Sequence, residues 1–163
     1  MAMDSRQMAV RTKNLILGID PGRDKTGFAF IDSDGNLLLS GIFASSERED
    51  FFAVLSSENK NFSRWTIEGS PESLEHSQIK FIALGDGTQS QKFFSWLNDK
   101  NFCEIIRVNE KNSTLEARAI YWKIHRPSLL MRLIPEGLRV PARVLDDLAA
   151  YIIALRALQN IEI

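Results

Sequence analysis

Acidic residues occur in this chain where predicted strands end. Asp20, Asp86 and Glu110 each follow an apolar run, and Asp146 and Asp147 stand at the start of the last predicted helix. Because the strands of one sheet end along shared edges, we expect several of these carboxylates to meet. Hydrolysis of a phosphodiester by a two-metal route needs such a cluster, whose hard oxygen ligands hold Mg²⁺ or Mn²⁺ ions about 3.5 to 4 Å apart. The pattern therefore predicts metal-dependent phosphodiester chemistry.

Each acid also has an ordinary structural interpretation. Asp86 lies between two glycines, where an acid commonly serves a turn, and for Asp86 alone this interpretation is at least as strong. Glu110 fits a solvated loop, whereas Asp146 and Asp147 fit the positive end of a helix. It is the combination of acids that favours a catalytic site.

Four short motifs occur in order along the chain. They are GIDPGRDKTG at 18–27, GDGT at 85–88, NEKNSTLEA at 109–117 and DDLAAYII at 146–153. In this order they resemble the YqgF/RuvX family, which belongs to the RuvC-like branch of the RNase H fold and includes pre-16S rRNA nucleases and Holliday-junction resolvases. The matches span most of the chain.

The resemblance implies an RNase H-like α/β domain, with a mixed five-stranded sheet flanked by helices. It implies a nuclease that uses Mg²⁺ or Mn²⁺ on structured RNA or branched DNA. Asp20 matches the shared metal ligand of the family, and Asp146 matches the acid of its last helix. With Asp86 and Glu110 they form the expected catalytic set, and Asp147 is a further candidate metal ligand.

The chain departs from the family pattern in two places. The family signature begins Asp-Glu-Arg, whereas this chain has Asn109, Glu110 and Lys111. An amide oxygen ligates a hard cation without contributing charge. Either Glu110 takes over the role, or catalysis is weakened and a nucleic-acid-binding protein remains. An apparent insertion at 64–80 also brings in Glu68 as an alternative to Asp86.

Two arguments disagree about the last helix. At roughly 100° per residue, Arg156, Gln159 and Asn160 mark the solvent face, which turns Asp147 toward the sheet. The motif match favours Asp146 as the site residue instead. Both acids therefore remain candidates.

Nucleic-acid binding must come from local cations, because the net charge is −1. Phosphate contacts would give salt-sensitive affinity without sequence selectivity. Tyr121 and Trp122 are candidates to stack on unpaired bases, although core packing is the stronger interpretation for at least one of them. The cations expected to contact nucleic acid are Arg23, Lys25, Arg118, Lys123, Arg139 and Arg143.

Hydrophobic periodicity and turn residues predict the elements that must position these side chains. A Ser-x-x-Glu box from Ser113 to Glu116 is expected to cap the third helix. The order of elements predicts a mixed sheet covered by helices. The expected strands are 15–20, 27–31, 37–43, 79–84 and 102–108, with an undecided strand at 65–67, and the expected helices are 46–55, 89–97, 113–125 and 143–159.

The composition fits one domain of ordinary size, with 163 residues of which 44% are hydrophobic. Residues 1–13 are expected to be a flexible extension, and 14–163 the domain. The single cysteine, Cys103, excludes an internal disulfide, and no Cys and His spacing fits zinc. With no apolar N-terminal stretch, we expect a cytoplasmic protein without a membrane partner, as a monomer or a homodimer.

An ATPase of the actin and sugar-kinase type is a distant alternative. The Gly-x-Asp-x-Gly turn with a nearby Thr-Gly also occurs in the phosphate-binding loops of that superfamily. Those proteins enclose a nucleotide between two such domains, and 163 residues hold only one.

Overall fold

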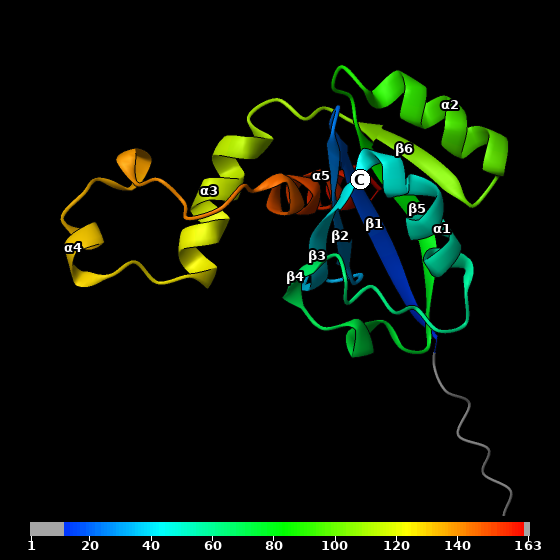
Figure 1. Ribbon diagram of the computed structural model, residues 1–163, viewed down its shortest axis with the longest axis horizontal. Coiled ribbons are helices and arrows are strands. Elements are labelled where there is room, and N and C mark those ends of the chain that lie inside the picture. Colours follow the sequence, from blue (N-terminus) through cyan, green and yellow to red (C-terminus); the bar gives the residue numbers. More distant parts are fainter. Residues whose placement is uncertain (1–11, 162–163) are drawn as a thin grey trace, which may run out of the picture.

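Six strands form one mixed sheet in the computed structural model, which describes residues 12–161 (Figure 1). Along the sheet the order is β4-β3-β2-β1-β5-β6. Strands β1 to β4 pair as antiparallel neighbours, whereas β5 runs parallel to β1, and β6 runs parallel to β5. The bounds are β1 Lys13–Pro21, β2 Lys25–Ile31, β3 Leu37–Ala44, β4 Thr66–Gly69, β5 Ser77–Gly85 and β6 Glu104–Val108.

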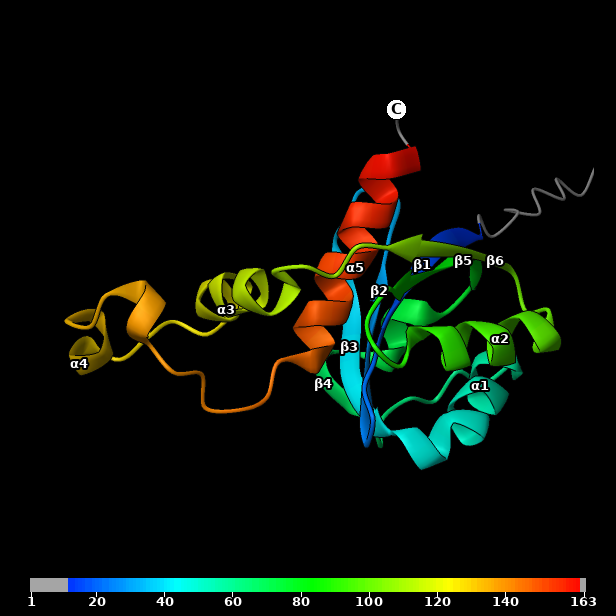
Figure 2. The same ribbon diagram turned by 90° about the horizontal axis from the view of Figure 1, so that it is seen from above.

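Helices cover both faces of this sheet (Figure 2). Over residues 12–161 they are α1 Arg48–Ser56, α2 Ser90–Lys100, α3 Ser113–Ile124, α4 Leu129–Arg132 and α5 Asp146–Ile161, with short 3₁₀ turns at Ser45–Glu47, Pro71–Leu74 and Glu136–Leu138. None of these helices is both long enough and apolar enough to cross a bilayer.

One face of the sheet is covered by α1 and α2 and is largely aromatic. In β1 the alternating residues Leu15, Leu17 and Ile19 point to this side, where they are fully buried. The rings of Phe43 on β3 and Phe51 on α1 stack with centroids 4.4 Å apart. This apolar layer fixes β1 in the centre of the sheet.

The opposite face is covered by α5, which packs against β1 and β2 and comes closest to them at two glycines. Residues of the other parity in β1, Ile16, Gly18 and Asp20, point to this side. A Cβ at Gly18 would lie 2.1 Å from the Ala150 carbonyl oxygen, and one at Gly27 would lie 2.0 Å from that of Asp146. Glycine at both positions lets the first half of α5 lie directly on the strands.

Helix α3 packs on α5 rather than on the sheet, through Ala117 and Tyr121 against Leu145 and Leu148. Beyond α3, residues 126–144 project from the rest of the molecule before the chain returns to α5 (Figures 1 and 2). We call residues 126–144 the arm.

The observed sheet confirms the expected mixed α/β arrangement but has one more strand than the five predicted. The sixth strand, β4, lies near the undecided segment 65–67. It is a short edge strand paired only with β3, with alternate residues exposed. A strand that buries so little carries a weak hydrophobic pattern, which explains why the sequence did not decide it.

Two helix ends differ from expectation. Helix α5 begins at Asp146 rather than Arg143, and the Arg143 side chain, which precedes the helix, donates to the Val144 carbonyl oxygen and to Asp147. The predicted capping box at Ser113 does not form: no side chain caps α3, and Glu116 binds Arg156 instead. The expected extension 1–13 lies outside the described residues except for its last two, and Lys13 already belongs to β1.

Replacing Gly18 with alanine should destabilise the protein by about 1 to 3 kcal/mol, the usual cost of overpacking a core. The added Cβ has no room between β1 and α5. Gly137→Ala is the matched control, since its Cβ would meet no atom within 4 Å. Urea unfolding of both variants measures the difference, and equal midpoints would contradict the proposed close packing.

Candidate functional site

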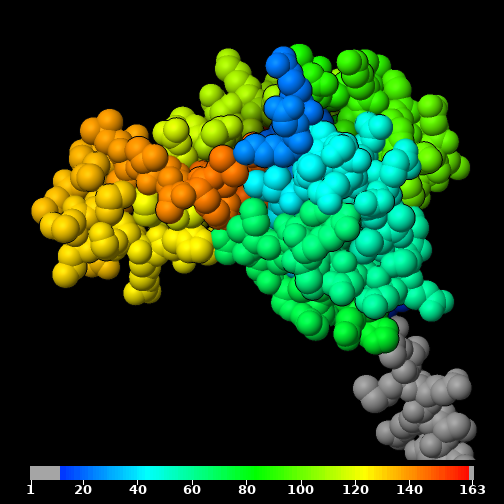
Figure 3. Space-filling model, viewed as in Figure 1, coloured from blue at the N-terminus to red at the C-terminus, as the bar shows by residue number. Residues whose placement is uncertain are grey.

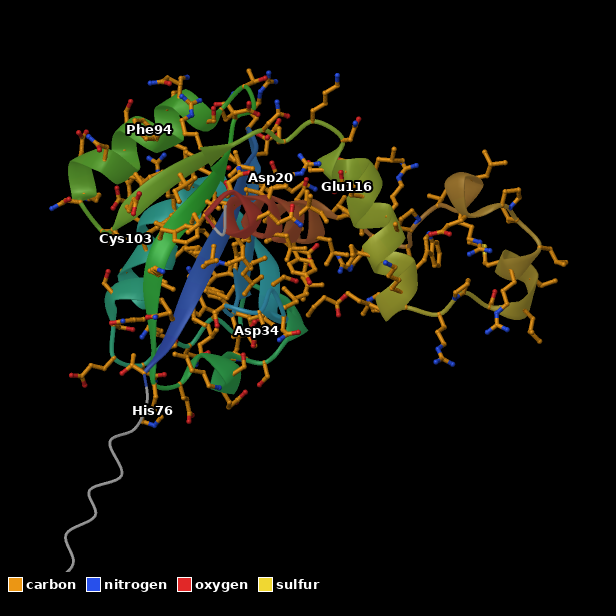
Figure 4. The ribbon with its side chains drawn as sticks, turned by 180° about the vertical axis from the view of Figure 1, so that it is seen from behind. Asp20, Asp34, His76, Phe94, Cys103 and Glu116 are labelled. Carbon is orange, nitrogen blue, oxygen red and sulfur yellow. The ribbon has the colours of Figure 1, made fainter. Side chains whose placement is uncertain are left out.

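Three carboxylates meet at the end of β1. The pKa of Asp20 is raised from 3.8 to about 7, first by burial and then by the negative charges of Glu110 and Asp146. Burial of Asp20 and the two nearby negative charges all disfavour its ionised form. Asp20 lies at the opposite end of the sheet from Asp34 (Figure 4). We call Asp20, Glu110 and Asp146 the acidic cluster.

Strand parity explains why these acids meet. Asp20 has the parity of Ile16 and Gly18, which face α5. Glu110 continues the parity of Ile106 and Val108, which also pack on the α5 side. Because β1, β5 and β6 run parallel, Asp20 and Glu110 emerge at the same edge, on the face where α5 begins with Asp146.

Asp146 is placed by the contact between α5 and β2. Its backbone lies against Gly27, which pairs with Asp20 across the β1–β2 ladder. Its Oδ2 atom is buried and accepts no hydrogen bond from residues 12–161, although Lys25 Nζ lies 3.6 Å away. At that distance the lysine partly balances the charge without satisfying the oxygen.

Glu110 is held by the turn after β5. Its backbone N–H donates to Asp86 Oδ1 at 3.0 Å. Burial raises the pKa of the Glu110 carboxyl, a hydrogen bond from the Gly87 N–H lowers it, and the charge of Asp86 raises it again. A Cβ at Gly87 would lie 2.3 Å from Glu110 Oε1, so a side chain there would displace this carboxylate from its present position.

Asp86 therefore supports the acidic cluster from beside it. Asp86 is exposed, and its side chain accepts a hydrogen bond from the backbone of Glu110. Its charge raises the pKa of Glu110, whereas the pKa of Asp20 is raised by burial, Glu110 and Asp146. Its parity is opposite to that of Gly85 and the α5-facing residues of β5. Of the predicted catalytic residues, Asp86 is the one that the structure sets apart.

Arg156 of α5 fixes the loop that carries Glu110, a role that the sequence did not indicate. Its guanidinium donates to the carbonyl oxygens of Asn109 and Lys111 at 2.5 and 2.9 Å, and to Glu116 at 2.6 Å. The Asn109 side chain accepts from the Lys111 N–H, which closes a local turn. The Asn109 amide thus shapes the loop.

The donor set of the acidic cluster fits a hard divalent cation. Glu110 Oε2 and Asp146 Oδ2 are both buried without a hydrogen-bond donor among residues 12–161. Within the same range, no three His, Cys, Asp or Glu side chains are close enough, as placed, to form a complete metal site. Binding an ion at the acidic cluster would require these side chains to move closer together.

Asp147 has a different environment from its neighbour Asp146. It is fully buried on the sheet side of α5, as the helical periodicity predicted. Its carboxylate accepts hydrogen bonds from Ser40 Oγ at 2.8 Å and from the Arg143 guanidinium at 2.7 and 3.3 Å. Because these donors already satisfy it, we assign Asp147 to structure and leave it out of the metal ligands.

Glu68 extends this buried network. Its Oε1 atom accepts from Arg143 at 2.7 Å and lies 2.6 Å from His125 Nε2. Burial alone would raise the pKa of the Glu68 carboxyl, but its bonds to His125 and Arg143 lower it overall. Glu68 thus ties together the two ends of the arm and does not join the acidic cluster, contrary to its proposed role as an alternative to Asp86.

Four of the six predicted cations remain available for a polyanion. Arg23 and Glu110 line the same open pocket, between the β1–β2 turn and the turn after β5, and Lys25 lies beside Asp146. Arg118 and Lys123 are exposed on α3. Arg139 and Arg143 are used internally: Arg139 Nε donates to the carbonyl oxygens of Met131 and Ile134, and Arg143 binds Asp147 and Glu68.

The aromatic candidates separate in the same way. Tyr121 is buried against α5, whereas Trp122 is partly exposed. The Trp122 Nε1 atom is buried and has no acceptor within residues 12–161. Of the two residues predicted to stack on bases, only Trp122 has a ring with exposed surface.

No protein-family model matches the chain, and a search of curated proteins finds no match.

Asp147→Ala should lower the free energy of unfolding by roughly 3 kcal/mol, the low end for breaking a buried ion pair, because Glu68 still binds Arg143. Asp146→Ala should change it by less than about 0.5 kcal/mol, since this carboxylate lies in a repulsive cluster. Chemical denaturation of the two variants measures the contrast. Equal losses would show that Asp146 is also a structural residue.

The raised pKa of Asp20 predicts a pH dependence of stability. Between about pH 4 and 7 the folded chain keeps a proton that the unfolded chain releases, so the free energy of unfolding falls as pH rises through this window. Asp20→Asn has no carboxyl to titrate at this position. From pH 5 to pH 8, its free energy of unfolding should therefore rise by on the order of 2 kcal/mol relative to that of wild type. Urea unfolding with EDTA present measures this gain, and parallel pH profiles would argue against the shift.

Proposed function

We propose that this protein is a metal-dependent nuclease with an RNase H-like fold, related to the YqgF/RuvX family. The observation that carries the proposal is the acidic cluster, in which burial of Asp20, and then the charges of Glu110 on the β6–α3 loop and Asp146 on α5, raise the pKa of Asp20 to about 7. The antiparallel meander β1–β3, continued by the parallel strands β5 and β6, fits such a domain, with β4 added at its edge.

The acids would hold Mg²⁺ or Mn²⁺ through Asp20, Glu110 and Asp146. When bound, such ions supply an activated water and stabilise the leaving oxygen of a phosphodiester. The chain provides the negative charge and buried, unsatisfied oxygen atoms that favour a cation over water. Arg156, Asp86 and Gly87 keep Glu110 in position for this role.

The substrate would be structured RNA or branched DNA. Arg23 and Lys25 lie beside the acids, while Arg118 and Lys123 extend the basic surface along α3. These cations would contact phosphates and position the backbone without selecting a sequence. Binding should therefore weaken steeply as salt increases.

Asp20→Asn and Asp146→Asn should each reduce metal-dependent cleavage of a four-way DNA junction or a structured rRNA precursor by at least about 100-fold, since each removes a ligand and a charge. Asp34→Asn is the control, because Asp34 is an exposed acid in the β2–β3 turn at the far end of the sheet (Figure 4). Gel assays with Mg²⁺ and with Mn²⁺ measure the rates.

Thermal unfolding gives a second readout that does not depend on the choice of substrate. Mn²⁺ should raise the melting temperature of wild type and of Asp34→Asn, but not that of Asp20→Asn, because an ion that binds only the folded state stabilises it. Salt-sensitive nucleic-acid binding without cleavage or metal stabilisation would instead indicate the weakened, binding-only protein.

A further inference from the structure

The arm carries almost all of the strongly exposed apolar surface of the described chain. Within residues 12–161, seven large apolar side chains have more than half of their surface exposed, and six of them lie in the arm. The seventh, Leu115, lies on α3. The six are Leu129 (79%), Leu130 (79%), Leu133 (82%), Leu138 (71%), Val140 (75%) and Val144 (51%).

The arm nevertheless has a defined conformation. Arg139 Nε donates to the carbonyl oxygens of Met131 and Ile134, and Ser128 Oγ accepts from the Met131 N–H at the start of α4. Glu68 binds both His125 and Arg143, which ties the two ends of the arm to the edge of the sheet. Figure 3 shows the arm as a separate lobe beside the body of the molecule. Its leucines are therefore held outward by the fold.

The exposed apolar surface of the arm lies at the upper end of the largest patch that a typical monomer carries, and such patches are often interaction sites. A mostly exposed aliphatic side chain offers on the order of 100 Å², so six offer roughly 600 Å². A specific interface covers about 800 Å² on each partner, with polar residues at its rim. The arm thus supplies most of the apolar part of one side of an interface.

We propose that two copies of this chain associate through their arms around a two-fold axis. The apolar surface that matches the arm is the arm of another copy, because the other strongly exposed apolar residue of the described chain, Leu115, stands apart on α3. Each arm also carries exposed Arg132 and Glu136, neither ion-paired within residues 12–161. Around a two-fold axis, a contact between the acid of one arm and the base of the other is formed twice.

The aliphatic character of the surface favours protein over nucleic acid as the occupant. The six exposed side chains are leucine and valine, with no aromatic ring to stack on a base. The two predicted phosphate-binding cations that lie in the arm, Arg139 and Arg143, are bound internally. The proposal does not depend on nuclease activity, because it concerns association in the absence of metal and substrate.

Sedimentation velocity of the full chain in EDTA tests the proposal. Wild type should be dimeric at micromolar concentration, whereas Leu129→Ser/Leu130→Ser/Leu133→Ser should be monomeric with an unchanged circular dichroism spectrum. Ile161→Ser, which removes a partly exposed isoleucine at the end of α5, should remain dimeric. A monomeric wild type, or a dimeric triple variant, would overturn the proposal.

Disulfide trapping keeps the test decisive if the triple variant fails to fold. Leu130→Cys in a Cys103→Ser background should form covalent dimers under mild oxidation at low protein concentration, at least tenfold faster than Ser95→Cys in the same background. Ser95 is exposed on α2, away from the arm. Equal trapping rates would overturn the proposal, as would a monomeric protein whose affinity for nucleic acid falls in the triple variant, because the arm would then contact nucleic acid.

Discussion

Direct contact between α5 and the centre of the sheet is the constraint on which the rest of the structure depends. Gly18 and Gly27 have no side chains, so the helix backbone can rest on β1 and β2. This contact brings the first residue of α5, Asp146, to the end of β1, where Asp20 emerges. The aromatic layer on the opposite face packs against β1 from the other side. The acidic cluster is thus a product of packing as much as of the acids themselves.

The two adjacent acids at the start of α5 have different environments because they point in different directions from the helix. Asp147 points into the protein and is neutralised by Arg143 and Ser40, which anchors the helix. Asp146 points to the end of the sheet and keeps an oxygen without a donor. The stabilising ion pair of Asp147 offsets the repulsion that Asp146 brings to Asp20. A buried, satisfied carboxylate therefore supports an unsatisfied one.

Much of this arrangement was predictable from the sequence, and the remainder depended on contacts between distant segments. Hydrophobic runs located five strands, and the turn residues after them located Asp20 and Glu110. Alternation along β5 carries the information that sets Asp86 apart, since it has the parity opposite to the residues that face α5. Helical periodicity correctly turned Asp147 inward. By contrast, nothing local in the sequence pairs Arg143 with Glu68 or Arg156 with the Asn109 carbonyl, because each pair joins elements more than 40 residues apart.

The ion pairs at Glu68 also hold the two ends of the segment between α3 and α5 close together. Since His125 and Arg143 bind the same carboxylate, the chain leaves and returns at one point on the sheet edge. Residues inserted into or deleted from that segment would change how far it extends from the sheet without displacing α5. The surface of this segment, and with it the binding partner, can therefore change while the carboxylates at the end of the sheet keep their positions.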